Sequence, residues 1–327
     1  MSSQKKKNFI IYSISLIKGI QANAERNEAE MDESVKINKI AFIGGDMRQV
    51  RAINRISESG REVAVFGFNR DVIHKMDNSV VKAENIAAIP SDIRVFVLPL
   101  PYSMDGENIK APFFDGMITI SELLQAIPPE SVLLAGRADA RLEALAEVYG
   151  IKLIDYFKRE ELMVLNAVPT AEGAIQLALE ETPHTLCGSE CLVTGYGRIG
   201  KILAHMLSGL GAHVSVAARK LGDAAAADSF GYRGIQMWKL HDVVDRFDVI
   251  FNTVPYMIFD GDMLRRIRRE TLLIDLASKP GGVDFDFAAR EDIKVIQALS
   301  LPGKVAPDTA GDIIKDTILN ILEELER

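Results

Sequence analysis

The sequence predicts a two-domain α/β protein in which each domain is built on a parallel β-sheet. Short apolar runs rich in β-branched residues alternate with amphipathic helical patterns, and this alternation occurs twice along the chain. Continuous apolar strands between helices are typical of parallel sheets that are covered on both faces. The 327 residues also exceed what one ordinary hydrophobic core supports. We therefore expect two Rossmann-like or flavodoxin-like domains with a cleft between them.

The first half contains five expected strands, and a glycine or proline marks the end of most of them. These strands are expected at 39–43, 62–66, 94–98, 132–135 and 152–154. Apolar residues at helical spacing predict helices at 47–59 and 139–149, which end at Gly60 and Gly150.

The second half repeats the scheme. Its strands are expected at 191–194, 213–217, 233–236, 249–251, 272–274 and 294–296. A helix at 169–181 bridges the two halves without a glycine-rich linker. The last segment, 313–325, is strongly amphipathic, and we expect it to return to the first domain.

These elements define four regions. Residues 36–165 form an N-terminal α/β domain on the substrate side, and residues 166–310 form a Rossmann domain that binds a nicotinamide dinucleotide. Residues 311–327 are the C-terminal helix. Residues 1–35 are interpreted as a disordered extension or the result of a misplaced start codon. Their apolar run at 9–17 is short and polar in places, so a signal peptide is disfavoured and no membrane span is expected here or elsewhere.

Charge and cysteine content exclude several classes of function. A formal net charge of −8 argues against a protein that binds nucleic acid or an anionic membrane, since both need a basic surface. The two cysteines, Cys187 and Cys191, cannot build a disulfide framework, which favours a reducing cytoplasm. No metal site is expected, because no histidine lies at ligand spacing from these thiols.

The segment Gly195-Tyr196-Gly197-Arg198-Ile199-Gly200 places the pattern G-x-G-x-x-G between an expected strand and an expected helix. Gly195 permits a tight turn, Gly197 lets a pyrophosphate approach the backbone, and Gly200 lets the helix pack closely on the strand. The helix N-terminus supplies amide donors for the anion. The segment therefore predicts a dinucleotide site.

The end of the next strand favours NADP, with NAD as the alternative. NAD-binding domains usually carry an acidic residue there, which accepts from the adenosine ribose. This chain has Arg219 and Lys220 instead. A guanidinium can bind a 2′-phosphate through two charge-assisted hydrogen bonds, although both residues could also be solvated surface charges. Asn252, Thr253 and Val254, which follow the fourth strand, are expected to complete the cofactor site.

Further motifs resemble the A component of dipicolinate synthase from spore-forming bacteria. The resemblance runs from about Lys39 to the C-terminus. The motifs that carry it are IGGDMRQ at 43–49, NAVPTAEG at 166–173, the glycine motif at 195–200, DLASKPGG at 275–282, and the segment from LPG at 301–303 through Ala310-Gly311. One departure is Lys279, where an arginine is expected.

The resemblance implies the last step of dipicolinate synthesis, a branch of the lysine and diaminopimelate pathway. It implies that a dihydrodipicolinate-type ring is oxidised to pyridine-2,6-dicarboxylate during sporulation. It also implies a flavoprotein-like partner, dipicolinate synthase B, and a location in the cytoplasm of the mother cell. A homo-oligomer is compatible with the same family.

A dicarboxylate substrate needs cations, and candidates at the expected strand ends are Arg48, Arg137 and Lys279. Oxidation by hydride transfer also needs a base, and Asp46 or Asp275 would serve if its surroundings raised its pKa. Ser278 and Asn252 could hydrogen-bond the substrate or the cofactor carboxamide. Either aspartate could instead cap a strand or helix end, and Arg48 could simply begin a helix.

Two other functions stay open. A D-2-hydroxyacid dehydrogenase has the same two-domain layout, but the segment Ala306-Pro307-Asp308-Thr309 lacks the histidine that donates a proton in those enzymes. The chain could also be a non-catalytic partner that binds NADPH and works only with dipicolinate synthase B. No pair of residues with distinctive catalytic chemistry, such as Cys–His, excludes this second function.

Overall fold

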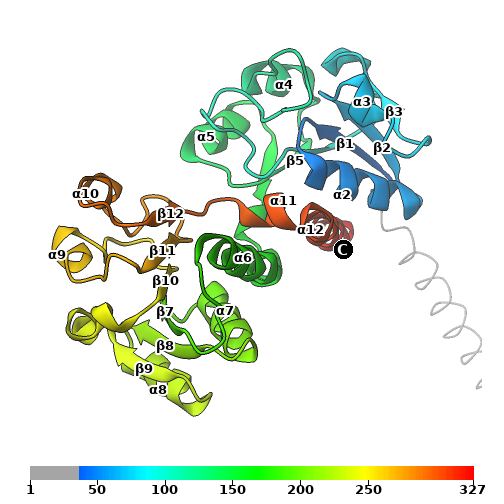
Figure 1. The fold of residues 1–327 in the computed structure, drawn as a ribbon. Helices are drawn as coiled ribbons and strands as arrows, with labels where there is room; N and C mark the ends of the chain where they lie inside the picture. The colour runs from blue at the N-terminus through cyan, green and yellow to red at the C-terminus, as the bar shows by residue number, and fades with distance from the viewer. Residues whose placement is uncertain (1–36) are drawn as a thin grey trace, which may run out of the picture. The chain divides into compact units, whose positions relative to one another are not determined.

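The computed structural model describes residues 37–327, so the extension expected at 1–35 lies outside the described residues. Two six-stranded sheets organise the chain (Figure 1), and all neighbouring strands within them are parallel. The predicted fold class is therefore confirmed.

The first sheet has the strand order β3-β2-β1-β4-β5-β6. Its strands are β1 (Lys39–Ile43), β2 (Glu62–Phe66), β3 (Val81–Lys82), β4 (Val95–Val97), β5 (Val132–Ala135) and β6 (Lys152–Asp155). The helices of this half are α2 (Met47–Glu58), α3 (Arg70–Ile73), α4 (Ile120–Ala126) and α5 (Ala140–Val148), with 3₁₀ turns η1 (Ile86–Ala88) and η2 (Tyr156–Lys158). The edge strand β3 was not predicted because two exposed residues show no periodicity.

The second sheet has the order β12-β11-β10-β7-β8-β9. Its strands are β7 (Glu190–Thr194), β8 (His213–Ala218), β9 (Arg233–Gln236), β10 (Val249–Asn252), β11 (Leu272–Asp275) and β12 (Val295–Gln297). Its helices are α7 (Arg198–Gly209), α8 (Leu221–Ser229), α9 (Gly261–Leu264), α10 (Phe285–Arg290) and α11 (Leu301–Val305), with 3₁₀ segments η3 (Met237–Asp242) and η4 (Val244–Arg246).

In both sheets the first strand of the half lies centrally, between the second and the fourth. This arrangement is the strand order of the Rossmann fold, and its topology reverses between the first and fourth strands. The central strands are buried on both faces, as the continuous apolar runs indicated. The carboxyl ends of β1 and β7 are therefore the places where ligands of such folds bind.

Helix α6 (Glu160–Glu181) connects the two halves and begins nine residues before the expected start at Pro169. Proline is typical of the first turn of a helix, so the pattern favoured a start there. The sequence-based expectation of no membrane-length segment was also wrong, because α6 is long and apolar enough to span a bilayer by composition. In this structure α6 packs along α7 and α11, and small residues such as Ala171 and Ala174 are fully buried.

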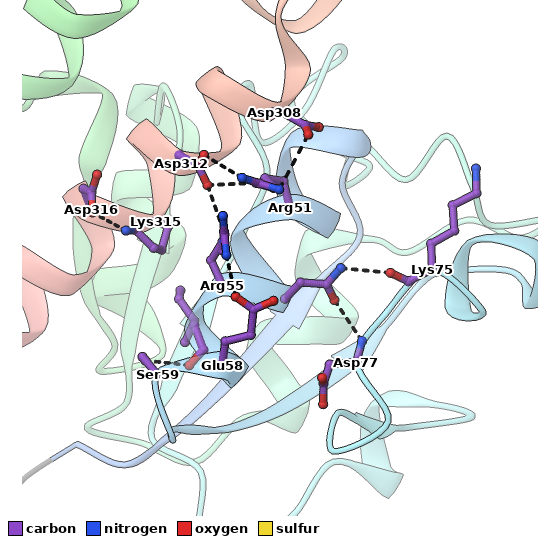
Figure 2. A network of polar contacts seen from close by, with 12 residues as sticks. Arg51, Arg55, Glu58, Ser59, Lys75, Asp77, Asp308, Asp312, Lys315 and Asp316 are labelled. Carbon is purple, nitrogen blue, oxygen red and sulfur yellow. Dashed lines mark hydrogen bonds and ion pairs between the residues drawn. The ribbon is translucent and has the colours of Figure 1, made fainter.

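The first part of α12 (Pro307–Glu326) packs on α2, which confirms the predicted return of the C-terminal helix to the first half. Arg51 of α2 donates from Nε and Nη2 to the two carboxylate oxygens of Asp312, at 2.8 and 2.9 Å (Figure 2). Gly311 makes the contact close: a Cβ there would lie 2.6 Å from Arg51 Cβ and 2.7 Å from the Arg48 carbonyl oxygen. The ion pair orients the helices, and the glycine sets their separation.

We predict that Gly311→Ala destabilises the protein by about 1–3 kcal/mol, because the added methyl group overpacks the α2–α12 contact. The matched control is Gly222→Ala in α8, where a Cβ would meet no atom within 4 Å. That change should be neutral or stabilising by up to about 1 kcal/mol, since alanine favours helix. Urea unfolding of the two variants measures the difference, and equal stabilities would contradict this packing argument.

Candidate functional site

The glycine motif forms the turn between β7 and α7. Gly195 has φ of +91°, and a Cβ there would lie 2.5 Å from Thr253 Oγ1 and 2.9 Å from Val254 Cγ2. A Cβ on Gly200 would lie 2.1 Å from the Gly195 carbonyl oxygen, so α7 reaches the strand only because this residue is glycine. A Cβ on Gly197 would meet nothing within 4 Å. The turn thus leaves open backbone at Gly197, at the N-terminus of α7, where a pyrophosphate binds in this fold.

The other residues of the motif have separate partners. Arg198 donates to Glu160 of α6 from Nε at 2.8 Å, so its side chain ties α7 to α6. The Tyr196 ring is buried, with Lys201 Nζ 5.6 Å from the ring centroid. Ile199 packs against the buried core of the second sheet. These three side chains support the turn, and the open anion site is formed by backbone.

Arg219 and Lys220 follow the last residue of β8, and both are exposed. Within residues 37–327 neither side chain has a hydrogen-bond or ion-pair partner. Their positive charges are therefore available to an anion at the carboxyl end of the strand next to β7. The site can hold a phosphorylated dinucleotide.

A row of buried polar side chains crosses the ends of three strands. Thr194, Asn252 and Asp275 are paired in register on β7, β10 and β11, and all three are completely buried. Thr194 Oγ1 donates to Asn252 Oδ1 at 2.6 Å, and Asn252 Nδ2 donates to Asp275 Oδ1 at 2.8 Å. Asp275 also accepts from the backbone N–H groups of Ala277 and Gly282. Asn252 and Asp275 therefore hold the strand ends and the 275–282 loop.

The loop after β11 presents Ser278 and Lys279 on the surface, where both are exposed. The Ser278 carbonyl accepts from Gly281 N–H at 2.9 Å, which closes the turn. Thr253 Oγ1 donates to the Thr194 carbonyl at 2.8 Å, so Thr253 joins β10 to the glycine turn. Ser278 and Lys279 are accessible, whereas Thr253 and Val254 line the underside of Gly195.

A second polar cluster lies at the end of β1 in the first sheet. Asp46 caps α2 by accepting from Arg48 N–H at 3.1 Å. Its carboxylate also binds the Arg48 guanidinium at both oxygens, at 2.9 and 2.7 Å. Arg48 is buried and donates further to the Leu100 carbonyl. Lys110 Nζ lies 2.8 Å from Asp46 Oδ2.

Lys110 was not predicted, because it is 64 residues from Asp46 in the sequence and belongs to no motif. Arg137, in contrast, is exposed at the end of β5, and its backbone N–H donates to Asp155. Within residues 37–327, no group of three or more His, Cys, Asp or Glu side chains could hold a metal ion.

The surroundings of Asp46 do not raise its pKa, which was the condition for its proposed role as a base. Burial alone would raise it, but the hydrogen bonds and charges of Arg48 and Lys110 outweigh burial and lower the pKa to about 2. Asp46 is therefore ionised at neutral pH and bound by two cations. It is a poor proton acceptor in this arrangement.

We predict that Gly197→Ala folds with near wild-type stability but binds NADPH at least tenfold more weakly, because a methyl group would meet only the bound anion. Gly200→Ala should instead lower stability by about 1–3 kcal/mol through overpacking of the turn. Thermal unfolding and NADPH fluorescence titration of both variants separate the two roles. Equal losses of stability in both would contradict them.

Asp46→Asn should lower stability at pH 7 by at least about 2 kcal/mol. The folded pKa of about 2 lies below the ordinary 3.8, so the carboxylate stabilises the folded state above pH 4. That stabilisation is lost between about pH 4 and pH 2, where the variant and wild type should converge. Denaturant unfolding from pH 2.5 to 7 measures this, and Asp262→Asn, in an exposed pair with Arg265, is the control. A pH-independent difference would argue against the ionised pair.

Comparisons with known proteins support both halves. Residues 39–157 match the family model of the N-terminal domain of dipicolinate synthase A. Residues 169–280 match that of the NAD-binding domain of D-isomer specific 2-hydroxyacid dehydrogenases. Dipicolinate synthase A of Bacillus subtilis (strain 168) is 35% identical over 291 residues, covering 88% of this chain and 97% of that protein.

Solved structures agree. Dipicolinate synthase A from B. subtilis has a TM-score of 0.81 at 34% identity, covering 89% of this chain and 97% of its own. Its counterpart from Bacillus halodurans has a TM-score of 0.82 at 29% identity, with coverages of 88% and 98%. A Sinorhizobium meliloti transhydrogenase, 14% identical with a TM-score of 0.67 over 88% of this chain and 94% of its own, shares the fold alone. The chain therefore belongs to the dipicolinate synthase A family, and it is a dehydrogenase-type oxidoreductase with a nicotinamide cofactor.

Proposed function

We propose that this chain oxidises a dihydrodipicolinate-type intermediate to dipicolinate, pyridine-2,6-dicarboxylate, with NADP. The observation that carries the proposal is the 35% identity over 97% of B. subtilis dipicolinate synthase A, which covers both the nucleotide half and the half that contains Asp46 and Arg48. When bound, the cofactor accepts a hydride from the dihydropyridine ring. The ring also loses a proton, and these two losses make it aromatic.

The residues of this chain bind and orient the reactants. The backbone at Gly197 and the N-terminus of α7 receive the pyrophosphate, and Arg219 with Lys220 receives the 2′-phosphate. The network of Thr194, Asn252 and Asp275 supports the turn and the loop that carries Ser278 and Lys279. Cations at the strand ends bind the two substrate carboxylates.

A second function has one observation in its favour. Asp275 is fully buried and Asp46 is held by two cations, so neither is an accessible base. A chain without such a base could serve as the NADPH-binding partner of a catalytic dipicolinate synthase B. In either case we infer a complex with this flavoprotein-like partner in the mother-cell cytoplasm during sporulation, in keeping with a family name that denotes one component of a larger synthase.

Mixing the purified chain with candidate substrate and NADP, with and without dipicolinate synthase B, distinguishes the two functions by dipicolinate absorbance. We expect product from this chain alone. Product that forms only when dipicolinate synthase B is added would favour the partner function, and absence of NADPH binding would contradict both.

For the cofactor, we predict that the wild type binds NADPH more tightly than NADH and that Arg219→Asp reverses the order. The variant replaces a cation with a carboxylate that repels the 2′-phosphate, which should weaken NADPH binding by about tenfold or more. The control is Arg269→Asp, an exposed arginine beyond α9. Fluorescence titration with both nucleotides measures this, and tighter NADH binding by the wild type would refute the preference.

A further inference from the structure

The loop between β4 and α4 holds Lys110 firmly against the turn after β1. Gly45 N–H donates to the Lys110 carbonyl at 2.9 Å, and Lys110 N–H donates to the Tyr102 carbonyl at 2.8 Å. A Cβ on Gly44 would lie 3.0 Å from the same carbonyl oxygen, so the two segments are in close contact. The Lys110 backbone is thus fixed on both sides.

The cluster of Asp46, Arg48 and Lys110 has one positive charge in excess, in a chain whose formal net charge is −8. Its two cations differ in availability. The Arg48 side chain is 7% exposed and is bound to Asp46 and the Leu100 carbonyl. The Lys110 side chain is 24% exposed, and only one of the three donors of its ammonium group has a partner. The accessible charge is therefore that of Lys110.

Two neighbouring features favour an anion at the same place. The N-terminus of α2, a helix of 12 residues, points its positive dipole end toward this cluster through the cap at Asp46. Gly303 of α11 lies against Arg48, because a Cβ there would be 2.9 Å from Arg48 Nε. Arg48 is thus confined from the side of α11, and its carboxylate partner is fixed with it.

We propose that Lys110 binds one carboxylate of the dicarboxylate substrate, and that Asp46 and Arg48 are positioning residues that hold its ammonium group. This inference rests on the proposed function, which supplies the dicarboxylate. It gives Asp46 a role different from proton acceptor: its fixed negative charge keeps the lysine protonated and oriented. Lys110 is the specificity-determining residue for a second carboxylate on the ring.

The test uses the full chain and two probes, dipicolinate and picolinate (pyridine-2-carboxylate), in calorimetric titrations with NADP present. Wild type should prefer dipicolinate. In Lys110→Met we expect dipicolinate binding to weaken by about tenfold to a hundredfold, which is the effect of losing a charged hydrogen bond. The preference for dipicolinate over picolinate should fall to about twofold or less, and NADPH affinity should stay within about twofold. Lys110→Arg should restore part of the preference, and Lys82→Met on β3 is the control.

Two results would overturn the role of Lys110 while leaving the proposed function intact. One is an unchanged preference for dipicolinate in Lys110→Met. The other is an equal loss of dipicolinate, picolinate and NADPH binding together with a lowered melting temperature, which would indicate a structural role. A wild type that binds NADPH but no dipicolinate would refute the substrate class, and with it this inference.

Discussion

Hydrogen bonding among Thr194, Asn252 and Asp275 links the carboxyl ends of three neighbouring strands. These side chains are fully buried, where an unpaired amide or carboxylate would be costly, and each has partners. The network fixes where β10 ends relative to β7 and so places Thr253 and Val254 under Gly195. It also fixes Gly282 and the start of the exposed loop at Ser278. The geometry of the cofactor turn and of the adjacent loop depends on this one row.

The first sheet uses charge where the second uses neutral hydrogen bonds. Asp46 lies at the end of β1, the topological equivalent of the glycine turn after β7, and is bound by Arg48 and Lys110. Two cations overcome the effect of burial and lower the pKa of Asp46. A carboxylate held in this way binds and orients rather than exchanges protons. The two halves share a strand order but present different chemistry at equivalent ends.

Helix α6 shows how a helix packed against other helices can have the composition of a membrane span. Its apolar residues are needed on more than one side, because it packs along α7 and α11. Pro169 is tolerated inside it, although a proline removes one backbone donor from a helix. Glu160, in its first turn, is bound to Arg198 at the start of α7. The connection between the two halves is thereby tied to the cofactor turn.

The sequence by itself determined the elements whose signal is local. Apolar runs ended by glycine predicted the central strands within one or two residues, and the pattern from Gly195 to Gly200 predicted the dinucleotide turn, because strand, turn and helix N-terminus are contiguous there. Short pieces such as β3, and helices with weak periodicity such as α8, had no such signal.

Tertiary structure decided which of the candidate polar residues are buried and which are accessible. Asp275 and Ser278 are three residues apart, yet one is fully buried and the other exposed. The partners of Asp46 include Lys110 from a distant loop, and Arg51 meets Asp312 across 261 residues. A parallel sheet brings together the ends of strands that are far apart in sequence, so the charge around a carboxylate, and with it the pKa, follows from the fold.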